Sequence, residues 1–277
     1  MGLFDKFFGR APKSDVVTLA PSPRPPSVPD VDNDDSGLPH DVRARLEALT
    51  REAHLDVDDL SPEEFDAALT SRLVDADRLT TSGLDFSYSS AFAPHLREVL
   101  TLDLPSAIVT LPDDRVAERG VRLPRLLDQA RRNLQQHMRT ADVQVTRVGG
   151  PNRSVQVISG DSPYTASYAR FLTEALELWH PHADTHGGIV FALPHRHAIV
   201  YQLCSNARQA QDAIELVPAQ AEAMQTDGLS PVSPHVYLWL DRQVTCLTEW
   251  APGGGLTLRL TPHLEGVLAG GRHRAAG

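Results

Sequence analysis

The chain has 277 residues, of which 41% are hydrophobic and 22% charged, values typical of a folded globular protein. Its formal net charge of −10 disfavours nucleic acid as a partner, because phosphate backbones would repel the molecule as a whole. Two cysteines provide neither a disulfide framework nor a four-ligand zinc pattern, and the longest apolar runs, about five to six residues, are too short to span a bilayer. We therefore predict a cytoplasmic protein.

The first nine residues carry an apolar face at helical spacing, formed by Leu3, Phe4, Phe7 and Phe8. We predict an amphipathic helix over residues 1–9. Such a short helix is not stable alone in water, so a protein partner, a membrane or the protein's own domain must cover the apolar face. The polar side offers only Lys6, with Arg10 and Lys13 nearby, which disfavours membrane contact. An unordered chain end is the alternative.

Residues 10–37 are rich in proline and end in an acidic run, a composition that predicts an extended, solvated linker. The pattern changes at Leu38, and we predict one globular domain over residues 38–270, followed by a flexible tail over 271–277.

The first part of this domain, residues 38–139, is predicted to be mainly helical. Apolar residues spaced three or four apart predict a helix over 42–53, and Ser61, Pro62 and Glu64 form a capping-box signal for the next helix. That helix is predicted to continue through Phe65, Leu69, Leu73 and Ala76. A short helix over 94–100, a strand over 107–111 and a helix over 123–138 complete this part.

The second part, residues 140–270, is predicted to follow the order ββ-α-ββ-α-ββ. Three pairs of apolar runs, each joined by a turn, predict β-hairpins over 143–158, 188–203 and 236–247, with helices over 168–179 and 207–224 between them. The two strands of the middle hairpin are almost continuously apolar, as is typical of strands buried on both faces. We predict an α+β fold: a mixed or antiparallel sheet built from β-hairpins, with helices packed on it and a helical segment before it.

Three stretches of this second part resemble the uncharacterised bacterial YtpQ-like family: residues 160–167, with the sequence GDSPYTAS, residues 190–196, VFALPHR, and residues 233–239, SPHVYLW. The resemblance covers roughly residues 103–247. It implies a cytoplasmic α+β domain and carries no catalytic residue, since the family has no established activity. His195 and His197 stand where that family tends to have Asn and Asp.

Histidines cluster in the sequence between positions 180 and 197. Imidazoles are good ligands for zinc, which makes a zinc site possible at His180, His182, His186, His195 and His197. Pro181 interrupts any helix there, however, and the spacing fits no standard metal-binding scaffold, so exposed loop histidines are the alternative. Cys204 and Cys246 lie on predicted strands, where a thiol is typically buried and inert.

Catalytic motifs for hydrolases and phosphate loops are absent from the sequence. The leading prediction is therefore a non-enzymatic interaction or accessory protein that docks an unidentified protein partner through Leu3, Phe4, Phe7 and Phe8. The alternative is a metal-binding protein or metalloenzyme centred on the histidine cluster.

Overall fold

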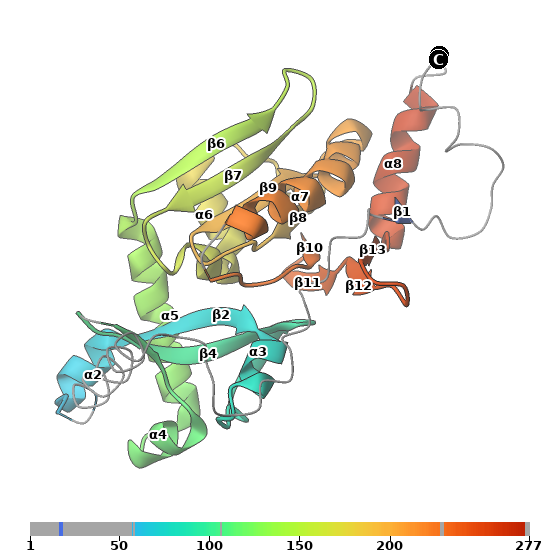
Figure 1. Ribbon diagram of the computed structural model, residues 1–277. Helices are drawn as coiled ribbons and strands as arrows, with labels where there is room; N and C mark the ends of the chain where they lie inside the picture. Colours follow the sequence, from blue (N-terminus) through green and yellow to red (C-terminus); the bar gives the residue numbers. More distant parts are fainter. Residues whose placement is uncertain (1–16, 19–56, 58, 106, 228–229, 275–277) are drawn as a thin grey trace.

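The computed structural model describes residues 17–18, 57, 59–105, 107–227 and 230–274 (Figure 1). Within them the fold is α+β, with helices packed on antiparallel sheets, which confirms the predicted fold class. The predicted helix over 1–9, nearly all of the predicted linker and the predicted helix over 42–53 lie outside the described residues.

The larger sheet contains six strands in the order β11-β10-β8-β9-β7-β6, and every neighbouring pair is antiparallel. Its strands are β6 (Val143–Gly149), β7 (Ser154–Gly160), β8 (Ile189–Ala192), β9 (Ala198–Leu203), β10 (Val236–Leu240) and β11 (Gln243–Cys246). The three predicted hairpins are confirmed, as β6–β7, β8–β9 and β10–β11. Strands β8 and β9 lie in the middle of the sheet and are buried along their whole length, as their apolar runs predicted.

Both faces of this sheet are covered. Its helical neighbours are η2, a 3₁₀ helix (Thr165–Phe171), α6 (Leu172–Trp179) and α7 (Ala207–Asp227). Strand residues alternate between the two faces, so Phe191 packs in the core with η2 and α6, while Val190 packs in the core with α7. The helix predicted over 168–179 is thus divided into η2 and α6. The helix α7 begins at Ala207 as predicted and extends beyond the predicted end at Met224, to Asp227.

The smaller sheet is formed by four strands, in the order β2-β4-β3 with β5 paired to the other end of β4. The elements of this region are α2 (Pro62–Ala68), β2 (Leu69–Asp75), α3 (Ala76–Thr81), β3 (Ser90–Ala93), β4 (Leu96–Asp103), β5 (Ile108–Thr110), α4 (Asp113–Glu118) and α5 (Leu123–Thr140). The capping box of α2, the strand β5 and the helix α5 confirm three predictions. The prediction that residues 38–139 are mainly helical is wrong for 69–110, where the smaller sheet lies.

The helix predicted through Phe65, Leu69, Leu73 and Ala76 ends at Ala68. Leu69, Ser71 and Leu73 also repeat every second residue, so the same apolar residues can lie on one face of a strand. The long ladder between β2 and β4 supplies backbone hydrogen bonds from Leu69 to Asp75, and this pairing outweighs the local helical pattern.

The short helix predicted over 94–100 is also wrong. Pro94 and His95 form the turn between β3 and β4, where His95 has a φ of +65°, and β4 begins at Leu96. Strand β4 pairs with β2 on one side and with β3 and β5 on the other, so its backbone is satisfied as the central strand of a sheet.

A third, small sheet follows the predicted region, in the order β1-β13-β12, formed by β1 (Val17–Thr18), β12 (Thr248–Trp250) and β13 (Leu256–Leu258). The helix α8 (Pro262–Arg274) then packs beside α7 (Figure 1) and crosses position 271, where the sequence predicted a tail.

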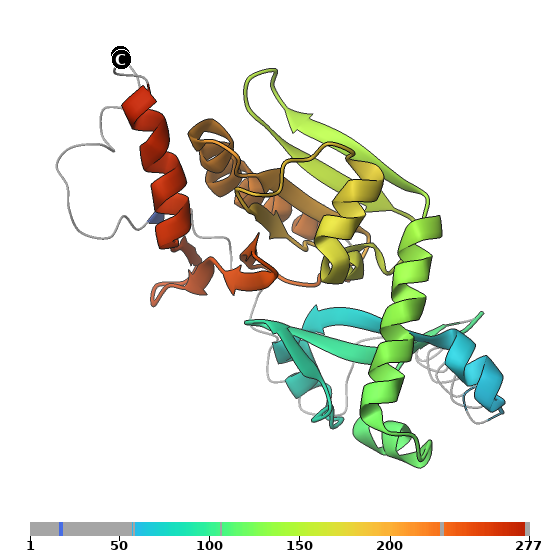
Figure 2. The same ribbon diagram turned by 180° about the vertical axis from the view of Figure 1, so that it is seen from behind.

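One hydrophobic core joins the two larger sheets. Leu73 and Leu96 of the smaller sheet belong to the same cluster as Ile158 and Tyr237 of the larger one. The helix α5 contributes to both regions: Leu126 and Ala130 pack on the smaller sheet, and Leu134 and Met138 pack in the shared core. Figure 2 shows α5, in green, running from one sheet to the other. Among the described helices, none has both the length and the apolar character needed to cross a membrane.

Candidate metal centre

Three side chains with metal-binding atoms meet where the smaller sheet contacts the larger one. They are His95, His235 and Cys246, and their ligand atoms all lie within 4.8 Å of one another. This is the one such group of three or more His, Cys, Asp or Glu side chains in the part of the chain that the structure describes. In Figure 1, the right-hand ends of β2 and β4 lie below β10 and β11, and the group forms at this junction.

The strand pairing explains how the larger sheet presents two of the three groups on one face. His235 immediately precedes β10 and stands two residues before Tyr237, so in extended backbone both side chains point to the same face of the sheet. Cys246 is the register partner of Tyr237 on β11, and directly paired residues share a face. The hairpin β10–β11 therefore fixes His235 and Cys246 beside each other.

The smaller sheet supplies the third group from its β3–β4 turn. The left-handed backbone of His95 reverses the chain between the strands, and its carbonyl accepts a hydrogen bond of 3.0 Å from the amide of Ala76. The imidazole of His95 stacks on that of His235, with ring centroids 4.1 Å apart and an interplanar angle of 12°. His95 is exposed and His235 is buried, so the stack runs from the surface into the core.

Burial sets the charge of His235. Desolvation and, to a smaller extent, the neighbouring His95 lower its pKa to about 4, and the hydrogen bond to Thr248 and the charge of Asp77 only partly oppose this shift. The imidazole is therefore neutral at pH 7. A neutral imidazole has a lone pair available for a metal ion.

Thr248 contacts two members of the group. Its hydroxyl oxygen lies 3.0 Å from Nδ1 of His235 and accepts a hydrogen bond of 3.1 Å from the amide of Val236. The same oxygen lies 3.9 Å from the sulfur of Cys246. When Nδ1 of His235 donates to this oxygen, Nε2 has the lone pair, and the Thr248 hydroxyl can donate to a Cys246 thiolate.

Cys246 is a protonated thiol in this arrangement. Burial raises its pKa, although the hydrogen bond of 3.1 Å from its sulfur to the carbonyl of Thr248 opposes the increase. Metal binding would therefore displace a proton from the sulfur. Cys204 is different, because it is fully buried and burial raises its pKa to about 12, which supports the prediction of an inert thiol there.

Trp250 lies at the edge of the group. Its indole ring stands nearly perpendicular to the His235 ring, with centroids 6.1 Å apart, and the side chain is 47% exposed. With His95 it forms the solvent side of the group, so a bound ion would keep access to water or a small ligand.

The five histidines singled out in the sequence lie in other surroundings. His180 shares a hydrogen bond of 2.8 Å with the Tyr201 hydroxyl, His186 is exposed beside Asp184, and Nε2 of His197 accepts a hydrogen bond of 2.8 Å from Arg196. His182 is exposed, and His195 lies with its ring centroid 6.2 Å from that of His197. No three of these described residues have ligand atoms close enough to share an ion.

Sequence reasoning missed His95, His235 and Cys246 because the three are separated by about 140 and 11 positions. Local spacing is the signal that identifies a metal motif in a sequence. Here the group depends on contact between two sheets, and the turn at His95 had itself been predicted as a helix. His195, by contrast, was predicted as a metal ligand only because it lies close in sequence to the other histidines.

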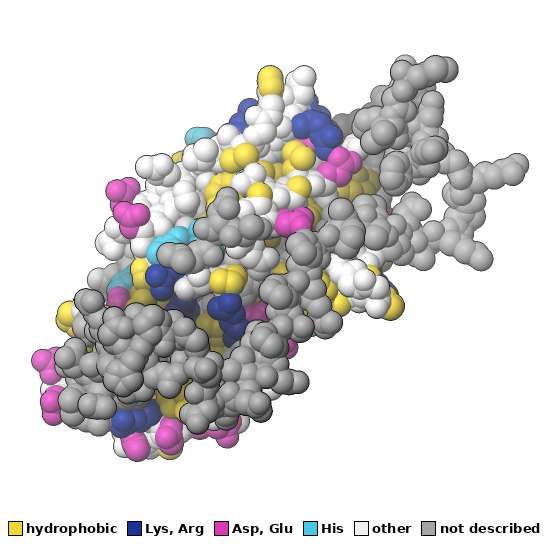
Figure 3. All heavy atoms as spheres, viewed as in Figure 1, with side chains coloured by type: hydrophobic (Ala, Val, Ile, Leu, Met, Phe, Trp, Pro, Cys, Tyr) yellow, Lys and Arg dark blue, Asp and Glu magenta, His cyan; other side chains and the backbone are white. Residues whose placement is uncertain are grey.

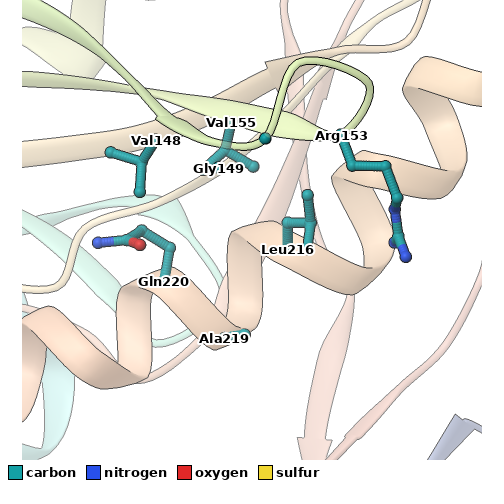
Figure 4. A pocket seen from close by; sticks show the side chains of 8 residues that line it. Val148, Gly149, Arg153, Val155, Leu216, Ala219 and Gln220 are labelled. Carbon is teal, nitrogen blue, oxygen red and sulfur yellow. The ribbon is translucent and has the colours of Figure 1, made fainter.

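A groove of about 390 Å³ lies between the β6–β7 hairpin and α7 (Figure 4). Its walls are mainly apolar, with Val148, Val155 and Leu216 facing the space. The charge at its rim, Arg153, forms ion pairs with Asp212 and Glu215. The groove therefore lacks the convergent, available polar groups of a reaction centre.

Comparison with known proteins gives no guide to this site: no family model, curated protein or solved structure matches the chain.

Proposed function

We propose that the protein binds zinc through His95, His235 and Cys246, and that the bound ion links the smaller sheet to the larger one. The observation that carries this proposal is the meeting of two imidazoles and one thiol within 4.8 Å at the junction of the sheets. Two nitrogen donors and one sulfur donor suit zinc, and three protein ligands leave the fourth tetrahedral position for water or a small ligand.

Binding requires a small local adjustment. In a tetrahedral zinc site with bonds of about 2.0 to 2.3 Å, neighbouring ligand atoms lie about 3.3 to 3.7 Å apart. The present separations of up to 4.8 Å must shorten, and the parallel imidazoles must tilt so that both nitrogens point at one ion. His95 can make this movement because it is exposed and lies in a turn, whereas His235 is held by Thr248.

Elemental analysis of the purified full-length protein, loaded with zinc and freed of excess metal, tests the proposal. We expect one zinc per chain, and loss of that zinc in His235→Ala and Cys246→Ser. Replacement of zinc by Co²⁺ should give thiolate-to-metal absorption that is lost in Cys246→Ser.

His182→Ala is the matched control, because His182 is an exposed member of the histidine cluster predicted from sequence. It should keep the metal. Absence of metal from loaded wild-type protein, or equal zinc content in wild type, His235→Ala and Cys246→Ser, would contradict the proposal. Circular dichroism of each variant separates loss of a ligand from loss of the fold.

Partner docking through Leu3, Phe4, Phe7 and Phe8 lies outside the described residues and stays a prediction. The resemblance to the YtpQ-like family and the cytoplasmic location also stay predictions. A metal-binding domain and a docking helix are compatible, since they use different parts of the chain.

A further inference from the structure

The strand β6 forms a free edge of the larger sheet. It pairs with β7 and with no other described strand, and Figure 1 shows it as the outermost strand. All of its residues pair with β7 in one unbroken register. The strand contains no proline, lysine or bulge, which are the features that commonly protect the edge of a natural sheet. Its outer backbone is therefore open to a further strand.

The hydrogen bonds at the two ends of the hairpin show which backbone groups of β6 are free. The amide of Gly150 donates to the carbonyl of Arg153 at 2.8 Å, which closes the turn. At the other end, the amide of Gly160 donates to His197 at 3.2 Å, away from β6. Bonding alternates along an antiparallel ladder, so every second residue of β6 directs its amide and carbonyl outward. These residues are Val143, Val145, Arg147 and Gly149.

The apolar groove lies at this edge. Val148 of β6 forms one wall, and Leu216 and Ala219 of α7 form the other (Figure 4). Helix α7 packs on β7, β8 and β9, and Gln144 and Thr146, on the same face of β6 as Val148, are exposed. Figure 3 shows yellow apolar side chains on this side of the molecule, below the tip of the hairpin. A strand added to β6 would thus place a side chain beside Val148 at the groove.

The edge also carries a positive charge without a counter-ion. Arg147 is exposed, and its guanidinium donates to the hydroxyl of Ser154 at 2.6 Å and to the carbonyl of Pro151 at 3.0 Å, both neutral acceptors. None of the ion pairs between described residues includes Arg147. A carboxylate in the position opposite Arg147 would complement this charge.

A second copy of the chain fits this edge poorly. Two β6 strands can pair antiparallel about a two-fold axis through their outward groups. The registers that pair most of the strand place Asp142, Gln144 or Thr146 of the second copy opposite Val148. Each of these side chains is polar and would lose water at an apolar groove without gaining a described partner. A large apolar side chain at that position suits the groove better.

We propose that the edge of β6 and the adjacent groove bind an extended segment of another protein. The segment adds an antiparallel strand to the larger sheet, places a large apolar side chain beside Val148 and presents a carboxylate to Arg147. Main-chain hydrogen bonds supply affinity in this mode, and the groove and the charge supply specificity. The site shares no residue with the proposed zinc site and is independent of it.

Fluorescence anisotropy with the full-length protein tests the proposal. The probe is the peptide Thr-Leu-Glu-Thr-Val-Thr-Val-Thr, with fluorescein at its N-terminus and an amide at its C-terminus. In the proposed register its Leu lies opposite Val148, its Glu opposite Arg147 and its first Val opposite Val145. We expect saturable binding of one peptide per chain, and binding at least about tenfold weaker when Leu is replaced by Ser or Glu by Lys.

Methylation of single peptide amides separates strand addition from binding in the groove alone. The amide of the first Val faces the outward groups of Val145, so its methylation should weaken binding at least about tenfold. The amide of the Thr before it faces away from β6, and its methylation should leave the affinity unchanged. Equal effects of the two methyl groups would contradict the addition of a strand.

Two protein variants test the two halves of the site. Ala219→Trp fills the groove from an exposed position and should weaken binding at least about tenfold. Ala117→Trp is the matched control, because Ala117 is an exposed alanine of α4, and it should bind like the wild type. Val145→Pro removes an outward amide and should also weaken binding. Circular dichroism of each variant separates loss of the site from loss of the fold.

Three outcomes would overturn the proposal. The first is no saturable binding of the peptide, or equal affinity in wild type, Ala219→Trp and Val145→Pro. The second is a dimer of the wild type in sedimentation that Val145→Pro dissociates, because a second copy would then occupy the edge. The third is tighter peptide binding by the variant Phe4→Ser with Phe7→Ser, because the N-terminal segment of the chain would then be the occupant.

Discussion

The two main sheets differ in the kinds of side chain that they bury. The central strands of the larger sheet, β8 and β9, bury mainly aliphatic and aromatic side chains on both faces, with Gln202 as a buried polar exception. The smaller sheet buries Thr70, Ser71, Glu98 and Thr101 as well as leucines. The larger sheet is therefore stabilised mainly by apolar contacts, and the smaller one also depends on hydrogen bonds and ion pairs.

The mainly apolar larger sheet therefore provides a stable scaffold, and the proposed zinc site lies where the smaller sheet meets it. This site takes His95 from a turn of the smaller sheet and is completed by His235 and Cys246 of the larger one. The tightly packed, mainly apolar strands of the larger sheet can hold such groups in place. The following experiments test this comparison.

The largest expected effect is a loss of stability in the larger sheet. Phe191 of β8 is fully buried, and its ring centroid lies 5.5 Å from that of Tyr237. Phe191→Ala should lower the free energy of unfolding by about 4 kcal/mol, through lost burial and the cavity left behind. Chemical denaturation measures the change. Leu178→Ala is the control, because Leu178 is 45% exposed and should cost far less.

The smaller sheet should instead be sensitive to the loss of one charge. Glu98 is 2% exposed and accepts hydrogen bonds of 2.9 and 2.6 Å from Arg131, and Arg170 approaches at 3.4 Å. Glu98→Gln leaves these guanidiniums without their carboxylate and should cost about 3 kcal/mol. A cost near zero would show that the ion pairs are dispensable and would remove the contrast between the sheets.

The pH dependence of this variant sharpens the result. Burial alone would raise the pKa of Glu98, but Arg131 and Arg170 reverse the effect and hold it below its ordinary value of 4.5. Ionised Glu98 therefore stabilises the fold above the unfolded-state pKa, and this contribution is lost as pH falls through the lower folded-state pKa. The stability difference between wild type and Glu98→Gln should be constant near neutral pH and should shrink on acidification below 4.5.

An intermediate effect is expected for Thr248, which contacts His235 and Cys246 without being a ligand. Thr248→Val keeps the size of the side chain and removes the hydroxyl, so zinc affinity should fall about 10- to 100-fold. Competition with a chelator measures the affinity. Thr257→Val, at another buried threonine of the small third sheet, is the control and should bind zinc like the wild type.

The smallest effect on stability is expected at the N-terminus. Phe4→Ser combined with Phe7→Ser should leave the thermal unfolding of the domain unchanged, because the hydrophobic clusters of the described residues are formed from Val57 onward. It should weaken capture of a protein partner from the native host. Equal capture by wild type and variant would remove the docking hypothesis, and a lowered unfolding temperature would show that the helix packs on the protein's own domain.

The local sequence pattern predicted secondary structure correctly where hydrogen-bonded segments lie close together in the sequence. The hairpins β6–β7 and β8–β9 were predictable because turn residues separate two apolar runs, and α5 because its apolar positions repeat over many turns. It failed at β2 and β4, which pair across more than twenty residues and whose spacing fits both a helix and a strand. The error at Pro94–Leu100 also concealed the position of His95.

The sequence by itself determined the α+β class, the order of hairpins and helices from β6 to β11, the burial of Cys204 and the capping of α2, because periodicity, turn residues and short-range hydrogen bonds set each of these. Only the tertiary structure decided which side chains meet. His95 reaches His235 and Cys246 because one core holds two sheets together across a long span of chain. That contact depends on packing between segments that are distant in the sequence, so the local spacing of residues does not predict it.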